Sequence, residues 1–247
     1  MLINCYNVET TKNSILKYLS INMCELDSLV NSCNRHLKNE EEDFLENMIK
    51  MLSYKFSFDT EMCVYLYHFT RTLDKSCYDK GIFPIKTIFK EVLESLWILV
   101  EDESLRDKWE EATNAFLSLK YGRYTSVPRT ECDNEINGFL FMEYGKEFHE
   151  QSVYYKEYGS ELVVDFLDFL TLKKSFQGLK KKYYEKSYSI YVRFPLLIHE
   201  KETKLKIMSL MIYYIALKNT GEDISYLSHT YTREEFVPAH EILIVEL

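Results

Sequence analysis

The sequence predicts an α+β fold: a single domain with a mixed or antiparallel sheet, flanking helices and an N-terminal helical segment. One observation is that apolar residues recur at three- and four-residue spacings, the pattern of amphipathic helices, over 11–56, 86–101, 103–120 and 204–219. Another is that shorter runs, several with two-residue alternation, predict strands at 62–71, 138–145, 160–170, 188–198 and 240–247. No linker rich in Pro, Gly or Ser separates these segments, so they are expected to share one core.

The composition fits a compact body and excludes several classes of function. Of the 247 residues, 46% are hydrophobic and only 7 are Gly and 4 Pro, so the chain can bury a sizeable core. The net charge of −9 argues against nucleic-acid binding as the main activity. No metal is expected, because none of the six cysteines forms a CxxC pair. No GxSxG, Walker A or GxGxxG sequence occurs either.

The cellular compartment is predicted from what the sequence lacks. The N-terminus "MLINCYNVETTKNS" has no basic segment followed by an apolar one, so no secretory signal is apparent. No apolar run approaches the roughly 20 residues that cross a bilayer. We therefore expect a cytoplasmic protein with reduced cysteines and no membrane partner.

The first part of the chain is predicted to be helical. "NSILKYLSINMCELDSLVNSCNRHL" and "EEEDFLENMIKMLSYKF" both carry the helical spacing. The acidic run from Glu40 to Asp43 lies where a helix dipole favours carboxylates, at the start of the second segment. The predicted organisation is an N-terminal helical segment over 1–61 and an α+β domain over 62–247.

The middle of the chain starts with the strand at 62–71. Asp74 to Ser76 favours a turn after this strand, and Gly81 and Pro84 are further turn residues before the next helix. The helices at 86–101 and 103–120 carry Trp97 and Trp109 on their apolar stripes, which places the tryptophans in the core. The polar stretch 121–138 is long enough for a lid or binding loop.

The C-terminal part alternates short strands with one more helix. The lysine-rich stretch "LKKSFQGLKKKYYEK" (172–186) is interpreted as a solvated connection, with binding of phosphates or single-stranded nucleic acid as the alternative. The helix at 204–219 is expected to end at Gly221. "HEILIVEL" then closes the chain as a strand.

The end of the first strand carries the candidate site. In "CVYLYHFTRTL", His68 and Thr70 share one face and Arg71 follows, at the end of an otherwise apolar run. An imidazole, a hydroxyl and a guanidinium can together hold a ribose, a phosphate or a carbonyl. The alternative is a hydrogen-bonded edge histidine beside a surface arginine. If the site is real, Arg71 must curl back toward the ligand, which the turn residues after it permit.

"LYHFTRTLDKSCYDKGIFPI" resembles the opening of ADP-ribosyltransferase-like domains of the DarT and PARP-like broad class. In those domains a strand with a His next to a hydroxyl or small residue precedes a short helix and a Gly-Ile or Gly-Leu pair, here Gly81-Ile82. The resemblance extends to "SVYYKEYGSELVVDF" and to "TREEFVPAHEILIVEL", and so covers residues 62–247. The helices at 86–120 depart from the compact version of that fold.

The resemblance implies an enzyme that uses NAD as a substrate. His68, with Thr70 and Arg71, would hold the ribose, amide or phosphates. An aromatic residue would position the nicotinamide ring, with Tyr155 and Tyr158 as candidates beside Tyr154. A glutamate would stabilise the oxocarbenium-like transition state. The candidates are Glu235, Glu161 and Glu234, with Glu157 and Glu241 behind them.

Two functions are therefore expected. The first is an ADP-ribosyltransferase-like enzyme or NAD glycohydrolase, in the role of a toxin, an effector or a phage-conflict factor. The acceptor is left open among protein, nucleic acid and water. The alternative is a non-catalytic module of the same fold that binds a protein partner.

Overall fold

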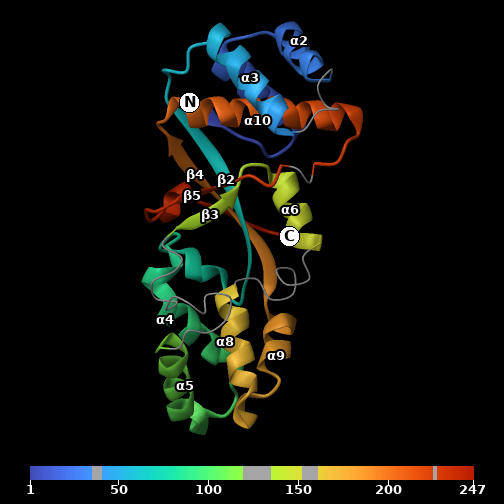
Figure 1. Ribbon diagram of the computed structural model, residues 1–247. Helices are drawn as coiled ribbons and strands as arrows, with labels where there is room; N and C mark the ends of the chain where they lie inside the picture. Colours follow the sequence, from blue (N-terminus) through green and yellow to red (C-terminus); the bar gives the residue numbers. More distant parts are fainter. Residues whose placement is uncertain (35–40, 119–134, 152–160, 225–226) are drawn as a thin grey trace. The chain divides into compact units, whose positions relative to one another are not determined.

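A computed structural model describes residues 1–34, 41–118, 135–151, 161–224 and 227–247, and its fold is α+β, as predicted (Figure 1). The α-helices are α1 (Val8–Leu19), α2 (Met23–Asn34), α3 (Glu41–Lys55), α4 (Ile85–Ser95), α5 (Arg106–Ser118), α6 (Met142–Gln151), α8 (Glu161–Thr171), α9 (Leu179–Lys186) and α10 (Lys201–Thr220). Short 3-10 helices are η1 (Lys75–Tyr78), η2 (Leu96–Leu99), η3 (Glu103–Leu105), η6 (Lys174–Phe176) and η7 (Ala239–Glu241). In the part of the chain described, no helix is long and apolar enough to span a membrane.

The strands form a mixed sheet, which confirms the predicted sheet type. They are β1 (Leu2–Ile3), β2 (Met62–Thr72), β3 (Ile136–Phe139), β4 (Tyr188–Ile198), β5 (Thr230–Arg233) and β6 (Leu243–Glu246). Their order is β5-β3-β2-β4-β6, with β1 also paired to β2. β1 runs parallel to β2, whereas β3 pairs with β2 and β6 with β4 in antiparallel register. The long strands β2 and β4 were both predicted from their alternation.

The described residues pack as two compact units that interleave along the chain. Unit 1 comprises Met1–Tyr67, Phe139–Lys146 and Phe194–Tyr231. Unit 2 comprises His68–Gly138, Glu147–Arg193 and Thr232–Leu247. The predicted division after residue 61 stays a prediction.

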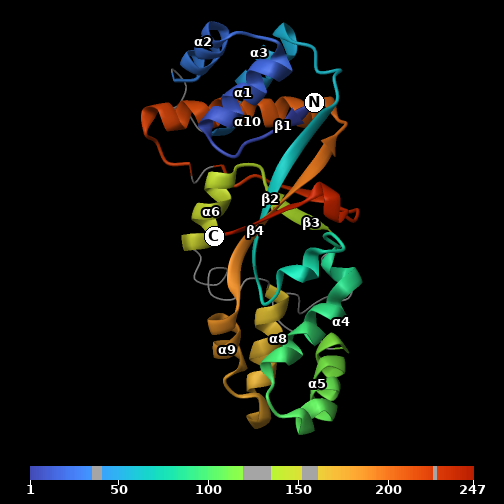
Figure 2. The same cartoon turned by 180° about the vertical axis from the view of Figure 1, so that it is seen from behind.

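Unit 1 is built around α10, which lies against α1, α2 and α3 in both ribbon views (Figures 1 and 2). The sequence "KIMSLMIYYIAL" is apolar almost all round, so this helix can only be stable when neighbours cover every side. Gly221, with φ of +73°, ends it in the left-handed conformation, as predicted. Near its start the buried Lys204 donates from Nζ to the carbonyl oxygens of Phe58 (3.2 Å) and Thr60 (2.9 Å).

The core of unit 2 lies among α4, α5, α8 and α9 and is dominated by Trp109. Its ring is fully buried and meets the rings of Trp97, Phe166 and Phe176 edge-on, with centroids 5.5, 5.3 and 5.8 Å apart. Both helices around Trp97 and Trp109 were predicted, and the prediction that these tryptophans serve core packing is confirmed.

Several element predictions were wrong in whole or in part. Residues 160–170, predicted as a strand, form α8, because Leu162, Phe166 and Leu170 follow the helical period and all face the core. The run 138–145 is divided: β3 ends at Phe139 and α6 begins at Met142. The stretch 172–186 contains α9 and is not merely a connection. Residues 119–134, which held most of the predicted lid, lie outside the described part of the chain.

Candidate functional site

His68 lies on β2 and is held by one of its two ring nitrogens. Its Nδ1 is 2.9 Å from the carbonyl oxygen of Asn137, on the neighbouring strand β3. A carbonyl can only accept, so Nδ1 carries the hydrogen, and in the neutral ring Nε2 is left as an acceptor. The side chain is half-buried and not sealed in the core. The imidazole is thus fixed in one tautomer with a single acceptor nitrogen.

Burial lowers the pKa of His68 from its ordinary value of 6.5, although the hydrogen bond to Asn137 opposes the shift. A lowered pKa means that protonation favours the unfolded chain. The contribution of His68 to stability is therefore complete above about pH 6.5 and decreases as the pH falls below it. The pKa of His229 in unit 1 is lowered by burial too, so it acts in the same direction.

We expect the His68→Gln variant to show a weaker pH dependence of stability than the wild type. The free energy of unfolding, measured by urea denaturation at about pH 7.5 and about pH 5.5, should fall less in the variant, because the destabilising protonation of His68 is removed. His229 stays in place and contributes to the slope that remains. Equal slopes in the two proteins would contradict the assignment of His68 as a buried neutral imidazole.

The guanidinium of Arg71 is hydrogen-bonded to other residues of unit 2. Its Nε donates to Ser187 Oγ (2.9 Å), its Nη1 to Ser189 Oγ (2.9 Å), and its Nη2 to the carbonyl oxygens of Tyr184 (3.2 Å) and Ser187 (2.5 Å). The guanidinium carbon also lies 5.1 Å from the centre of the Tyr184 ring. We predicted that Arg71 would curl back to a ligand's phosphates. To bind phosphates, Arg71 would have to give up its hydrogen bonds to Ser187, Ser189 and Tyr184.

The surroundings of Arg71 were missed from the sequence. Ser187, the extended residue between α9 and β4, and Ser189 in β4 stand two residues apart, so their side chains point to the same side. His149, at the end of α6, places its Nε2 3.3 Å from Ser189 Oγ, and its ring lies 5.9 Å from that of Phe69. The pattern Ser-x-Ser is the local signal that could have marked this face, but nothing local indicates Arg71 as its partner.

Thr70 is buried within the protein, and the chain turns after Arg71. Thr70 is only 6% exposed, and its hydroxyl lies 3.5 Å from the carbonyl oxygen of Arg71. The predicted turn is confirmed: Asp74 caps η1 by accepting from the Ser76 amide (2.9 Å). Thr70 therefore faces protein in this structure, and a contact with NAD remains a prediction.

Gly81 and Ile82 are joined to the segment that follows the Glu234–Glu235 pair. The amides and carbonyls of Ile82 and Val237 exchange hydrogen bonds of 2.8 and 2.9 Å. Gly81, with φ of +106°, lies so close that a Cβ there would be 2.1 Å from the Val237 carbonyl oxygen. Phe83 and Phe236 stack with ring centres 4.6 Å apart. The two stretches quoted for the resemblance thus meet within unit 2.

The candidate carboxylates differ in setting. Glu234 and Glu235 are both exposed, between β5 and the bridge at Val237. Glu241 accepts from Arg233 Nη1 at 3.3 Å. Glu161 is the first residue of α8, but its side chain lies outside what the structure describes. Residues 152–160 lie outside it too, and they include Glu157 and the candidate tyrosines Tyr154, Tyr155 and Tyr158.

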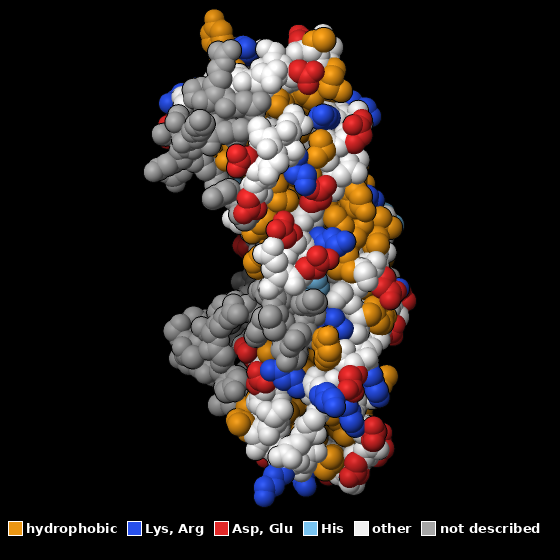
Figure 3. Space-filling model, turned by 90° about the vertical axis from the view of Figure 1, so that its right-hand side faces the viewer, with side chains coloured by type: hydrophobic (Ala, Val, Ile, Leu, Met, Phe, Trp, Pro, Cys, Tyr) orange, Lys and Arg blue, Asp and Glu red, His pale blue; other side chains and the backbone are white. Residues whose placement is uncertain are grey.

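Three of the four lysines of α9 are paired with acids, which weighs against a free basic patch there. Lys180 pairs with Asp168 (2.7 Å), Lys182 with Glu101 (2.9 Å) and Lys181 with Glu185 (3.7 Å). On the face shown in Figure 3, Lys and Arg side chains are interspersed with Asp and Glu. Nucleic-acid binding through this stretch remains the less favoured prediction.

Comparison with known proteins adds no assignment. No protein-family model matches the chain, and neither the curated proteins nor the solved structures compared with it yield a match.

Proposed function

We propose that this chain is an NAD-using ADP-ribosyltransferase-like enzyme. The observation that carries the proposal is that His68, Thr70, Arg71 and Glu235, the predicted catalytic and cofactor-binding residues whose side chains the structure describes, all lie in unit 2. Between the first and the last lie more than 160 residues of sequence. In the sheet, the strand before Glu235 (β5) is two strands from β2, about 10 Å at the usual strand spacing. A dinucleotide can span that distance.

The chemistry follows from the groups present. The bond between ribose C1′ and nicotinamide N1 breaks, and its electron pair leaves with nicotinamide, so positive charge develops on the ribose. Glu235 supplies a carboxylate to stabilise that charge and to take the proton of the attacking nucleophile. With water as the acceptor, the products are ADP-ribose, nicotinamide and one proton.

His68 has the geometry of a substrate-orienting residue in this scheme. Because Nδ1 is committed to Asn137, the neutral ring offers Nε2 as an acceptor for a ribose hydroxyl. Its lowered pKa keeps the ring neutral near pH 7. The roles of Tyr155 and Tyr158 at the nicotinamide ring, and of Glu161 as the alternative carboxylate, belong to the same proposal.

The biological setting is also part of the proposal. A toxin, effector or phage-conflict factor acting in the cytoplasm would find NAD there as a substrate. Cytoplasmic cysteines stay reduced, and Cys5, Cys24 and Cys77 are free thiols in the structure.

Nicotinamide release from NAD tests the proposal directly. The full chain is incubated with NAD, alone and with protein or nucleic acid as acceptor, and nicotinamide is quantified by chromatography. We expect release by the wild type and a loss on the order of 100-fold or more in Glu235→Gln, as for removal of a catalytic acid–base group. His68→Ala should weaken NAD binding roughly ten- to hundredfold in calorimetry. His199→Ala and Glu202→Gln, exposed positions in unit 1, are the matched controls.

The outcomes separate the candidates. Loss of activity in Glu161→Gln but not in Glu235→Gln would move the catalytic role to Glu161. The proposal would be defeated if the wild type released no nicotinamide and also bound no NAD.

A protein-interaction module is the second candidate. The observation favouring it is that Arg71, the strongest predicted phosphate ligand, is engaged with groups of its own chain.

A further inference from the structure

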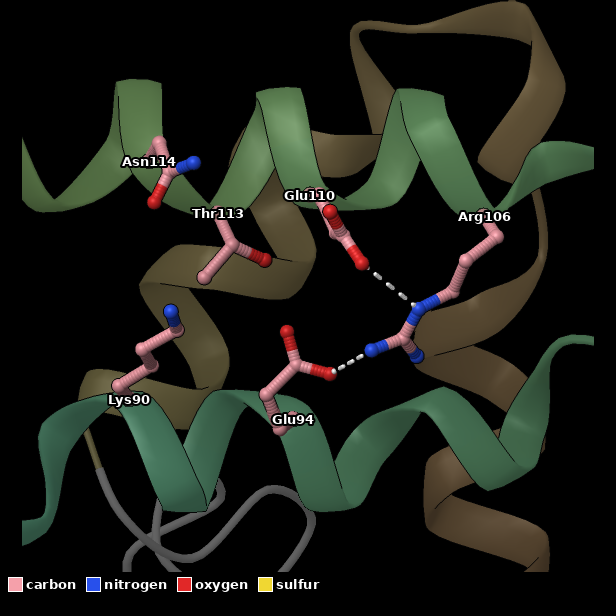
Figure 4. A pocket seen from close by; sticks show the side chains of 6 residues that line it. All are labelled: Lys90, Glu94, Arg106, Glu110, Thr113 and Asn114. Atoms are coloured by element: carbon pink, nitrogen blue, oxygen red, sulfur yellow. Dashed lines mark hydrogen bonds and ion pairs between the residues drawn. The ribbon is translucent and has the colours of Figure 1, made fainter.

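A polar pocket of about 290 Å³ lies between α4 and α5, apart from the site described above (Figure 4). Its size is close to the lower end of small-molecule sites in proteins. Its lining residues all carry polar groups: Lys90, Glu94, Arg106, Glu110, Thr113 and Asn114. All belong to unit 2, and none was singled out from the sequence.

One side of the pocket presents carboxylates held in place by Arg106. Its Nη2 donates to Glu94 Oε2 at 2.7 Å and its Nε to Glu110 Oε1 at 3.2 Å. The guanidinium itself packs over the Trp97 ring at 5.0 Å. Because Arg106 contacts one oxygen of each carboxylate, the second oxygen of Glu94 remains able to accept from a ligand. This side is a pre-positioned acceptor site.

The other side presents donors. In Figure 4, Lys90 and Asn114 lie at that end of the pocket, and Thr113 lies between them and the carboxylates. Thr113 is 1% exposed, and its hydroxyl has no hydrogen-bond partner in the described structure, although a helical threonine commonly bonds the preceding turn. Lys90 Nζ has no ion-pair partner within 4.0 Å among the described residues. A buried hydroxyl without a hydrogen-bond partner and an ammonium without an ion-pair partner among the described residues line the same pocket, which indicates a place for an anionic group.

We propose that this pocket binds a small zwitterion, a free α-amino acid being the simplest. Its carboxylate would accept hydrogen bonds from Lys90 and Thr113, and its ammonium group would donate to Glu94. Lys90 and Glu94 are one helical turn apart, about 5–6 Å between Cβ atoms, which suits the short separation of the two groups in an amino acid.

Charge balance distinguishes a zwitterion from a simple anion. The two cations and two carboxylates of the lining sum to zero, so a neutral molecule with both charges leaves each pocket charge compensated. A phosphate dianion would instead be repelled by Glu94 and Glu110. A simple cation would be repelled by Lys90 and Arg106.

The test is a binding screen on the full chain. The twenty standard amino acids, each at about 10 mM, are compared for an increase in melting temperature, and any that raise it are titrated by calorimetry. We expect at least one to bind. Its analogues lacking the amino or the carboxyl group should bind at least tenfold more weakly, because each loses one charged contact. Inorganic phosphate should not compete.

Variants locate the binding. Lys90→Met should weaken it at least tenfold and Thr113→Val about fivefold. Lys86→Met, an exposed position one turn earlier on α4 and outside the pocket, should leave it unchanged. Binding that survives Lys90→Met intact, competition by phosphate, or no binding by any of the twenty amino acids would overturn the proposal. Melting curves without ligand show that each variant is folded.

Discussion

Substitution of Gly81 by alanine should destabilise the protein by about 3–5 kcal/mol. A positive φ of +106° is strained for any residue with a Cβ, at about 1–3 kcal/mol. The added Cβ would also lie 2.1 Å from the Val237 carbonyl oxygen, which backbone movement must relieve. That movement breaks the hydrogen bonds between Ile82 and Val237, each contributing about 1 kcal/mol. Urea denaturation measures the change.

Gly178→Ala is the matched control for this prediction. Gly178 also has a positive φ, +84°, but nothing lies within 4 Å of the position of its Cβ. Its replacement should therefore cost only the conformational strain, about 1–2 kcal/mol. Equal losses in the two variants would show that the close approach to Val237 contributes nothing to stability.

The same variant reports on function. Because the bridge holds the chain just after Glu235, Gly81→Ala should reduce nicotinamide release more than Gly178→Ala does, at a temperature where both are folded. Hydrogen exchange at the Val237 amide, which donates to the Ile82 carbonyl, shows whether the bridge has opened.

Substitution of Arg71 by methionine should lower the free energy of unfolding by about 3 kcal/mol. Methionine keeps much of the apolar stem but removes the donors to Ser187, Ser189 and the Tyr184 carbonyl. Hydrogen bonds to charged groups contribute about 1.5–3 kcal/mol each, and partial exposure of the guanidinium reduces their sum. Arg71→Lys should recover less than half, because an ammonium cannot reproduce the planar fork.

Lys75→Met is the control for a cation at an exposed position. Lys75 pairs with Glu246 at 2.7 Å and lies 5.3 Å from the Tyr188 ring centre, but both charged side chains are about half exposed. Its loss should lower the free energy of unfolding far less than Arg71→Met does, because solvent screens an exposed ion pair. A double-mutant cycle of Arg71→Met with Ser189→Ala isolates the energy of that contact.

Two measurements distinguish the roles open to Arg71. If it is structural, stability falls while the NAD affinity of the folded variant is preserved. If it binds phosphates, NAD affinity falls ten- to hundredfold and stability changes little. The hydrogen bonds in the structure favour the first result.

Local patterns predicted those elements whose apolar residues fit a single period. The helical spacing before Gly221 predicted α10, and the two-residue alternation predicted β2 and β4. The same reasoning failed at 160–170, where "LVVDFLDFL" is so apolar that it is compatible with either period, and burial in the core selected the helix. The strand at 138–145 failed for a similar reason, since its apolar run is shared between β3 and α6.

By itself, the sequence determined the α+β class, the two long strands, the central helix α10 and the placement of His68, Thr70 and Arg71 at the end of β2. Only the tertiary structure decided what those residues touch: Asn137 for His68, and Ser187 and Ser189 for Arg71. It alone joined Gly81 to Val237 and assembled the pocket around Arg106. The physical reason is that periodicity records which face of an element is buried. The partner of a polar side chain, more than a hundred residues away for Arg71, is set by how the elements pack.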